Sequence, residues 1–126
     1  MLIDTDVIIW HLRGNSHAGR SIQNASSRAI SAITYMEVVR GLRNKEEARH
    51  WQAFLKNLEF QILPVEERIS AKAMFWMDEF SLSHTLQIPD ALIAATAEIN
   101  GLILMTGNVS DYRFLPGLNL KTFKAQ

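Results

Sequence analysis

Short apolar runs alternate along this chain with longer segments whose apolar residues recur at helical spacing, and this alternation limits the folds open to it. The strands are expected at residues 1–3, 28–32, 60–65, 102–106 and 120–123. The helices are expected at residues 6–13, 15–27, 45–58, 66–84 and 89–100, with a short one after residue 34. Strands joined through helices pair in parallel, and helices then cover both faces of the sheet. The sequence therefore predicts a three-layer α/β/α fold with a central, mainly parallel sheet.

Length and composition are those of an ordinary globular protein. The 126 residues are expected to form one domain, residues 1–126, which is long enough to bury roughly two thirds of its unfolded surface. Hydrophobic residues make up 48% and charged residues 21% of the chain. The 13 basic and 13 acidic residues cancel. This balance neither supports nor excludes RNA binding, because RNA needs a local basic surface rather than a net charge.

Several absences in the sequence narrow the possible chemistry and location. The chain has no cysteine, which excludes disulfides, thiol nucleophiles and cysteine-based zinc sites. No apolar run reaches the ~18 residues of a membrane-spanning helix. The N-terminus lacks the basic start of a signal peptide. We therefore expect a cytoplasmic protein that does not enter a membrane.

Acidic residues lie at or near the ends of otherwise apolar elements. Asp4 closes the first apolar run, Asp90 falls in the first turn of a helix rich in alanine, and Asp111 follows the run of residues 102–105. Glu37 opens another apolar helix. A carboxylate in such surroundings is costly unless positive charge meets it, and Mg²⁺ prefers carboxylate oxygens and water. Because sites in parallel sheets form beyond the carboxyl ends of the strands, these acids are expected at one edge of the sheet.

Helix capping offers a competing explanation for some of these acids. Asp4 could cap the first helix, but Asp6 or Thr5 can already do so, which favours a functional role for Asp4. Glu37 follows Thr34 by three residues, the spacing of a capping box, and on this fact alone the cap is slightly favoured. The helix dipole explains Asp90 about as well as a functional role does.

Turn chemistry and solvation explain the remaining polar residues. Asn108 and Asp111 suit a turn, although Asn108 could hydrogen-bond a metal-bound water and Asp111 could supply a further carboxylate. Arg40 and Arg43 belong to a basic run that is usually a solvated face. Beside a metal site the same run would contact RNA phosphates.

Four segments carry a resemblance to a known family. They are Leu-Ile-Asp-Thr-Asp at residues 2–6, Ile-Thr-Tyr-Met-Glu at 33–37, Ile-Pro-Asp-Ala-Leu-Ile-Ala-Ala-Thr-Ala at 88–97, and Leu-Met-Thr-Gly-Asn-Val-Ser-Asp-Tyr at 104–112. In order and spacing they resemble the PIN-domain ribonucleases, in particular the VapC toxins of bacterial and archaeal toxin–antitoxin pairs. The resemblance implies an endoribonuclease that uses Mg²⁺ or Mn²⁺, is held inactive by an antitoxin, and forms homodimers.

The resemblance also implies roles for single residues. Asp4, Glu37 and Asp90 match three family carboxylates: Asp4 and Asp90 would hold the metal, and Glu37 would hold it through water or position the attacking water. Neutral Asn108 stands where many relatives carry aspartate, and Asp111 matches the acid of a common variant. Thr5 or Thr106 would orient a carboxylate.

Two other functions remain open at this point. The Asp-x-Asp after the first strand is also similar to the haloacid-dehalogenase-like phosphatases, in which the two acids act as nucleophile and general acid. That class leaves Glu37 without a role and needs a lysine and paired acids that are not obvious here. The second alternative is a non-catalytic PIN-like module that binds RNA or protein, for which Asn108 is the best support.

Overall fold

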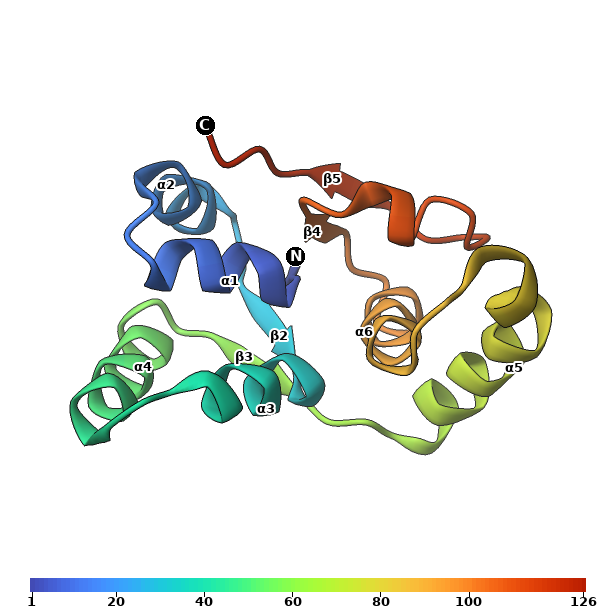
Figure 1. Cartoon of the computed structure of the whole chain (residues 1–126), viewed down its shortest axis with the longest axis horizontal. Coiled ribbons are helices and arrows are strands. Elements are labelled where there is room, and N and C mark those ends of the chain that lie inside the picture. The colour runs from blue at the N-terminus through green and yellow to red at the C-terminus, as the bar shows by residue number, and fades with distance from the viewer.

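The computed structural model describes residues 1–126, and its central sheet has five strands in the order β3-β2-β1-β4-β5 (Figure 1). The strands are β1 (Leu2–Ile3), β2 (Ala29–Ser31), β3 (Gln61–Leu63), β4 (Leu104–Thr106) and β5 (Leu120–Thr122). All four strand pairings are parallel. The predicted three-layer α/β/α fold with a mainly parallel sheet is therefore confirmed.

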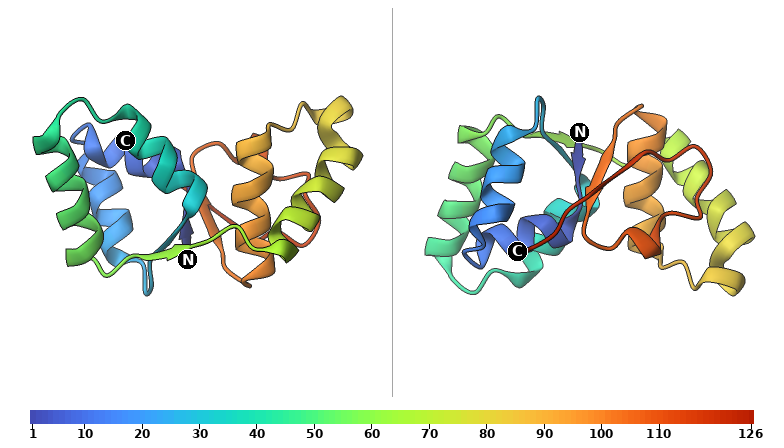
Figure 2. Two further views of the ribbon diagram at one scale, coloured as in Figure 1. Left: turned by 90° about the horizontal axis from the view of Figure 1, so that it is seen from below. Right: turned by 90° about the horizontal axis from the view of Figure 1, so that it is seen from above.

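Six α-helices cover the two faces of this sheet (Figure 2). They are α1 (Thr5–Leu12), α2 (Ser16–Asn24), α3 (Ala32–Gly41), α4 (Lys45–Asn57), α5 (Glu67–His84) and α6 (Ile88–Ile99), and a short 3-10 helix, η1 (Val109–Asp111), follows β4. Helices α1 to α4 lie on one face, and α5 and α6 lie on the other. None of these helices combines the length and the apolar character needed to cross a membrane.

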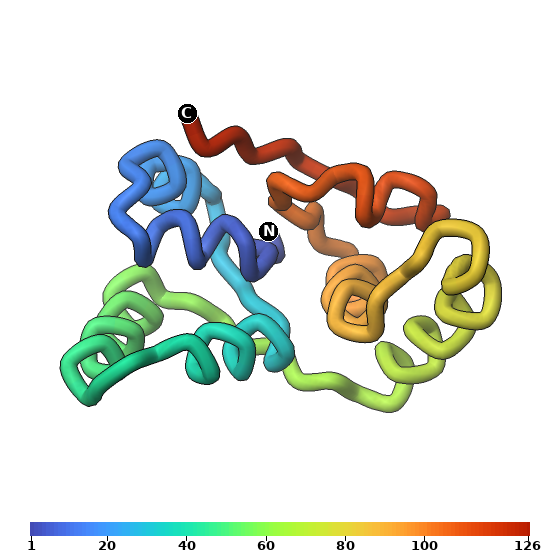
Figure 3. The backbone as a smooth tube through the Cα atoms, in the orientation of Figure 1, coloured from blue at the N-terminus to red at the C-terminus, as the bar shows by residue number.

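The alternation of side chains along β1 explains why there are two cores. Leu2 belongs to the cluster formed with α5 and α6, whereas its neighbour Ile3 belongs to the cluster formed with α1 to α4. Successive strand residues point to opposite faces, and strands buried on both faces are continuously apolar. The C-terminal segment returns towards α2 (Figure 3), where Phe123 packs against His17. This segment thereby covers part of the apolar cluster formed with α1 to α4.

Two helices begin at residues other than those predicted. The N-cap of α1 is Asp4, whose Oδ1 accepts a hydrogen bond from the Thr5 amide, so the interpretation of Asp6 or Thr5 as the cap is wrong. The N-cap of α3 is Ser31, so the capping box of Thr34 and Glu37 is also wrong. In both cases the helix starts directly where strand pairing stops. The other predicted elements are present, with ends that shift by no more than three residues.

Candidate functional site

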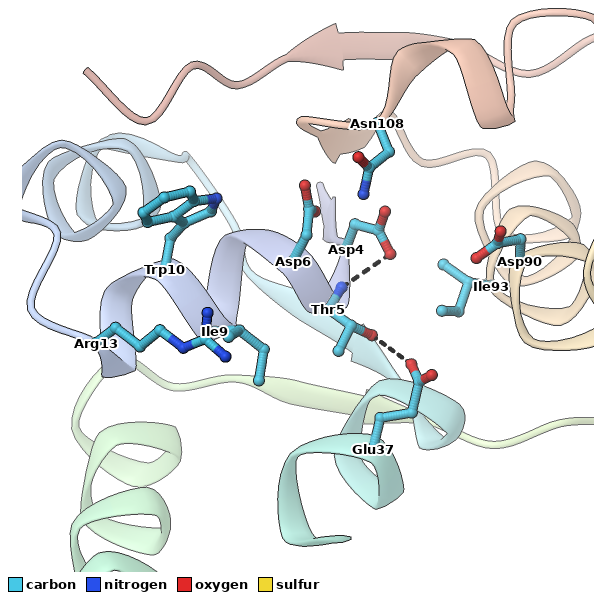
Figure 4. A pocket seen from close by; sticks show the side chains of 10 residues that line it. All are labelled: Asp4, Thr5, Asp6, Ile9, Trp10, Arg13, Glu37, Asp90, Ile93 and Asn108. Carbon is cyan, nitrogen blue, oxygen red and sulfur yellow. Dashed lines mark hydrogen bonds between the residues drawn. The ribbon is translucent and has the colours of Figure 1, made fainter. Parts of the chain in front are cut away.

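A pocket of about 380 Å³ opens at the carboxyl edge of the sheet, between the start of α1, α3 and α6 (Figure 4). It is lined by Asp4, Thr5, Asp6, Ile9, Trp10, Arg13, Glu37, Asp90, Ile93 and Asn108. The chain runs outward from β1 to β2 and β3 and then returns to place β4 on the other side of β1. The pocket thus lies beyond the switch point between β1 and β4, where ligands bind in open parallel sheets.

Asp4 is the most deeply buried acid in the pocket, with only 4% of its surface exposed. The Thr5 amide donates to its Oδ1 at 2.8 Å, and the Thr106 hydroxyl donates to its Oδ2 at 2.7 Å. Burial, with a contribution from the charge of Asp6, raises the pKa of the Asp4 carboxyl to about 6, although the hydrogen bond from Thr106 opposes the shift. Thr106 thus orients the Asp4 carboxylate.

Glu37 projects into the pocket from the middle of α3. Its Oε1 accepts a hydrogen bond at 2.7 Å from the Thr5 hydroxyl, which also lies 2.9 Å from the Thr34 hydroxyl. The side chain is otherwise exposed to solvent. Helix α1 therefore orients the Glu37 carboxylate, a relation that the capping-box interpretation did not foresee.

Asp90 faces these acids from the first turn of α6, across the pocket. Its Oδ1 accepts a hydrogen bond at 3.2 Å from the phenol of Tyr112. Burial, followed by the charge of Asp4, raises the pKa of Asp90 to about 6. Burial and the charges of both aspartates raise the pKa of the Tyr112 phenol, so this group stays protonated and donates.

Asp6 is a fourth acid in the pocket, although its place in the sequence favoured a capping role. Its Oδ2 accepts from the Gly107 amide at 2.9 Å, which ties α1 to the loop after β4. Its Oδ1 is buried and has no hydrogen-bond partner. A Cβ at Gly107 would lie 2.6 Å from Asp6 Oδ2, so this contact requires glycine. The signal in the sequence was the second acid of the Asp-x-Asp after β1.

Four of the predicted site residues do not line this pocket. Thr106 is buried and reaches the site only through its hydrogen bond to Asp4, and the other three are exposed. Asp111 is exposed, but its charge contributes to the raised pKa of Asp6 and of Asp90. Arg43 pairs with Glu47, with 2.7 Å between Nη2 and Oε2, and lines a neighbouring pocket instead. Arg40 is exposed on α3 and lines neither pocket.

The neighbouring pocket has a volume of about 530 Å³ and lies between α1, α3 and α4. Its walls include Val38 from α3 and Leu42, the C-cap residue of that helix, and it shares Ile9 and Arg13 with the first pocket. Both pockets therefore lie along α1 and share part of their walls.

The donor atoms of the first pocket fit a hard divalent cation. No group of three or more carboxylate or histidine side chains is arranged to hold a metal ion by itself, but Mg²⁺ is usually held by one or two carboxylates together with water and substrate phosphates. The chain has two ion pairs, Arg43–Glu47 and Lys72–Glu98, and neither involves an acid of this pocket. Asp6 Oδ1 is in addition a buried acceptor with no donor. These carboxylates, none of which forms an ion pair, define a candidate cation site at the switch point of a parallel sheet.

Comparison with known proteins identifies the family. Residues 1–114 match the PIN domain. Ribonuclease VapC10 of Mycobacterium tuberculosis is 34% identical over 86% of this chain and 83% of its own length. Ribonuclease VapC1 of Rickettsia felis is 30% identical over the whole of this chain and 98% of its own length. A toxin–antitoxin complex from Klebsiella pneumoniae contains a chain 30% identical to this one, with a TM-score of 0.81 and coverage of 96% of this chain and 95% of that one. The chain belongs to the PIN-domain family.

Proposed function

We propose that this chain is the toxin of a type II toxin–antitoxin pair, an endoribonuclease that depends on Mg²⁺ or Mn²⁺ and hydrolyses RNA phosphodiester bonds. The observation that carries the proposal is the gathering of four carboxylates, from three segments far apart in the sequence, around one pocket, where none of them forms an ion pair. The relatives named ribonuclease support the reaction class.

The contacts of each acid indicate whether it would bind the cation or act on the attacking water. Asp4 and Asp90 would hold the cation from opposite sides of the pocket. Asp6, which lines the pocket, would supply the further carboxylate expected of Asp111. When bound, Mg²⁺ supplies positive charge that neutralises the phosphate and acidifies water. Glu37, oriented by Thr5, accepts a hydrogen bond from the attacking water and takes up its proton.

Two substitutions test this assignment. Asp4→Asn and Asp90→Asn are expected to lower cleavage of labelled single-stranded RNA, at saturating Mg²⁺, by more than the roughly 10–100-fold lost when a partner outside the ligand sphere is removed. Circular dichroism should show that both variants keep the fold. The control is Asp78→Asn, an exposed acid on α5 far from the pocket. Wild-type rates in either site variant at saturating metal would refute the assignment.

Two assays of the wild-type protein distinguish a nuclease from a phosphatase and from a non-catalytic module. Membership of the PIN-domain family favours a nuclease over a haloacid-dehalogenase-like phosphatase. A phosphatase would hydrolyse a phosphomonoester and leave RNA intact, whereas a nuclease would do the reverse. A non-catalytic module without a working carboxylate cluster would show no heat in a calorimetric titration with Mn²⁺.

We further propose that the protein acts in the cytoplasm and that an antitoxin covers the two pockets along α1. The solved toxin–antitoxin complex at 30% identity supports the partner. The pocket walled by Val38 and Leu42 offers apolar surface to a helix laid beside the acids.

Homodimerisation stays a prediction, which a measurement of molar mass in solution tests. Exposed Met74, Phe75 and Leu82 on α5 offer apolar surface for it.

A further inference from the structure

Helix α1 carries two side chains into the acidic pocket for which the proposed chemistry has no use. Trp10 and Arg13 both line the pocket and follow Asp6 by four and seven residues. This spacing places the three side chains on one face of the helix. With a rise of 1.5 Å per residue, Arg13 lies about 10 Å further along the helix axis than Asp6. Figure 4 shows Trp10 beyond Asp6 along α1, with the Arg13 side chain beside Ile9.

Trp10 is exposed in a way that the fold does not require. Its side chain is 43% exposed, whereas Trp51 and Trp76 are exposed by 0% and 1%. The core contacts of α1 are made instead by Val7 and Ile8, which are fully buried. An indole left open beside a site for a phosphodiester offers a flat apolar face on which an unpaired base can stack.

Arg13 is the only positively charged residue among those that line the pocket. It is exposed, forms no ion pair, and lines both this pocket and the neighbouring one. A guanidinium binds phosphate oxygens through two parallel hydrogen bonds. Because the acids repel a polyanion, attraction for RNA has to come from groups placed beyond them.

We propose that Trp10 and Arg13 form a subsite for the nucleotide next to the cleaved bond, with its base stacked on the indole and its phosphate held by the guanidinium. This inference rests on the proposed nuclease function. It implies a preference for unpaired RNA, because both faces of a base inside a duplex are already covered by its neighbours. Stacking on an aromatic ring tolerates any base, so this subsite selects single strands rather than a sequence.

Steady-state kinetics with a single-stranded oligoribonucleotide provide the first test. Trp10→Ala should raise KM about tenfold and leave kcat within about twofold, because the acids are untouched, whereas Trp10→Phe, which keeps an aromatic face, should restore most of the loss. Arg13→Gln should raise KM and lower the salt dependence of binding by the share of one phosphate, a slope of about 0.7. The control is Arg20→Gln, an exposed arginine on α2 outside both pockets. An unchanged KM in Trp10→Ala, with RNA still cleaved, would overturn the subsite and leave the nuclease standing.

Fluorescence provides a second test that does not depend on cleavage. Since Trp51 and Trp76 are buried, acrylamide should quench mainly Trp10. In the Asp4→Asn protein, a single-stranded oligoribonucleotide should protect Trp10 from acrylamide, and a duplex of the same sequence should not. Trp10→Phe should remove the quenchable fraction. Equal protection by the duplex would contradict stacking of an unpaired base. Protection by a protein partner alone, with none by RNA, would show instead that this face is a protein-docking surface.

Discussion

The hydrogen bonds of the acids in the pocket show which carboxylate oxygens have a donor and which have none. Both oxygens of Asp4 have a donor, and Asp90 has one from Tyr112. Asp6 Oδ1 has none although it is buried, and a buried acceptor left without a partner costs about 1–3 kcal/mol. Asp6 also lines the pocket, whereas exposed Asp111 does not, so Asp6 is the stronger candidate ligand.

Metal titration separates these two acids. Asp6→Asn should weaken Mn²⁺ binding by about tenfold or more, whereas Asp111→Asn, which only reduces the negative charge nearby, should cost less. Isothermal titration calorimetry measures both affinities. Gly107→Ala serves as a second variant, because its Cβ would displace the Asp6 carboxylate without changing its charge. The opposite order of effects would place Asp111 in the site.

Helices α1 and α3 are coupled through the first residue of α1. Thr5 lies next to Asp4 in the chain and reaches across to Glu37 and Thr34 on α3. Since Glu37 is otherwise exposed, its direction depends on this contact. A helix start set by the end of β1 thereby positions an acid 32 residues further along.

Removing that hydroxyl should affect turnover rather than metal binding. Thr5→Val keeps the shape of the side chain and loses the donor to Glu37, so kcat is expected to fall about tenfold, the lower end of the range for partners that orient a catalytic group. Thr5→Ser should restore most of the rate. Both variants should bind Mn²⁺ like the wild type in calorimetry. Full activity in Thr5→Val would mean that another group orients Glu37.

Folding of the whole molecule brings the carboxylates together and makes its stability depend on pH. The pKa of Asp4 and of Asp90 rises from 3.8 to about 6 on folding, mainly through burial. The folded chain therefore binds more protons than the unfolded chain between these values, and its stability falls as pH rises from about 4 to 6. For Asp4 the shift corresponds to roughly 3 kcal/mol at most, and for the more exposed Asp90 to less.

Urea unfolding of the metal-free protein tests this linkage. The free energy of unfolding should be higher at pH 5 than at pH 7.5, and the difference should shrink in Asp4→Asn. Adding Mg²⁺ at a hundred times its dissociation constant should stabilise the protein at pH 7.5 by about 2.7 kcal/mol. The gain from the same Mg²⁺ concentration should be smaller at pH 5, where protons compete for the carboxylates. A pH dependence in Asp4→Asn equal to that of the wild-type protein would contradict the burial of Asp4.

The sequence by itself determined the layers of the fold and the approximate positions of Asp4 and Asp90, because the spacing of apolar residues records which faces are buried. Which residue caps each helix was not readable, since Asp4 and Ser31 cap where strand pairing ends. Only the tertiary structure brought the face of α1 that carries Asp6, Trp10 and Arg13 into one pocket with Glu37 and Asp90. The physical reason is that the direction of a polar side chain depends on how its helix is rotated against the sheet, and a periodic apolar pattern gives that rotation only roughly.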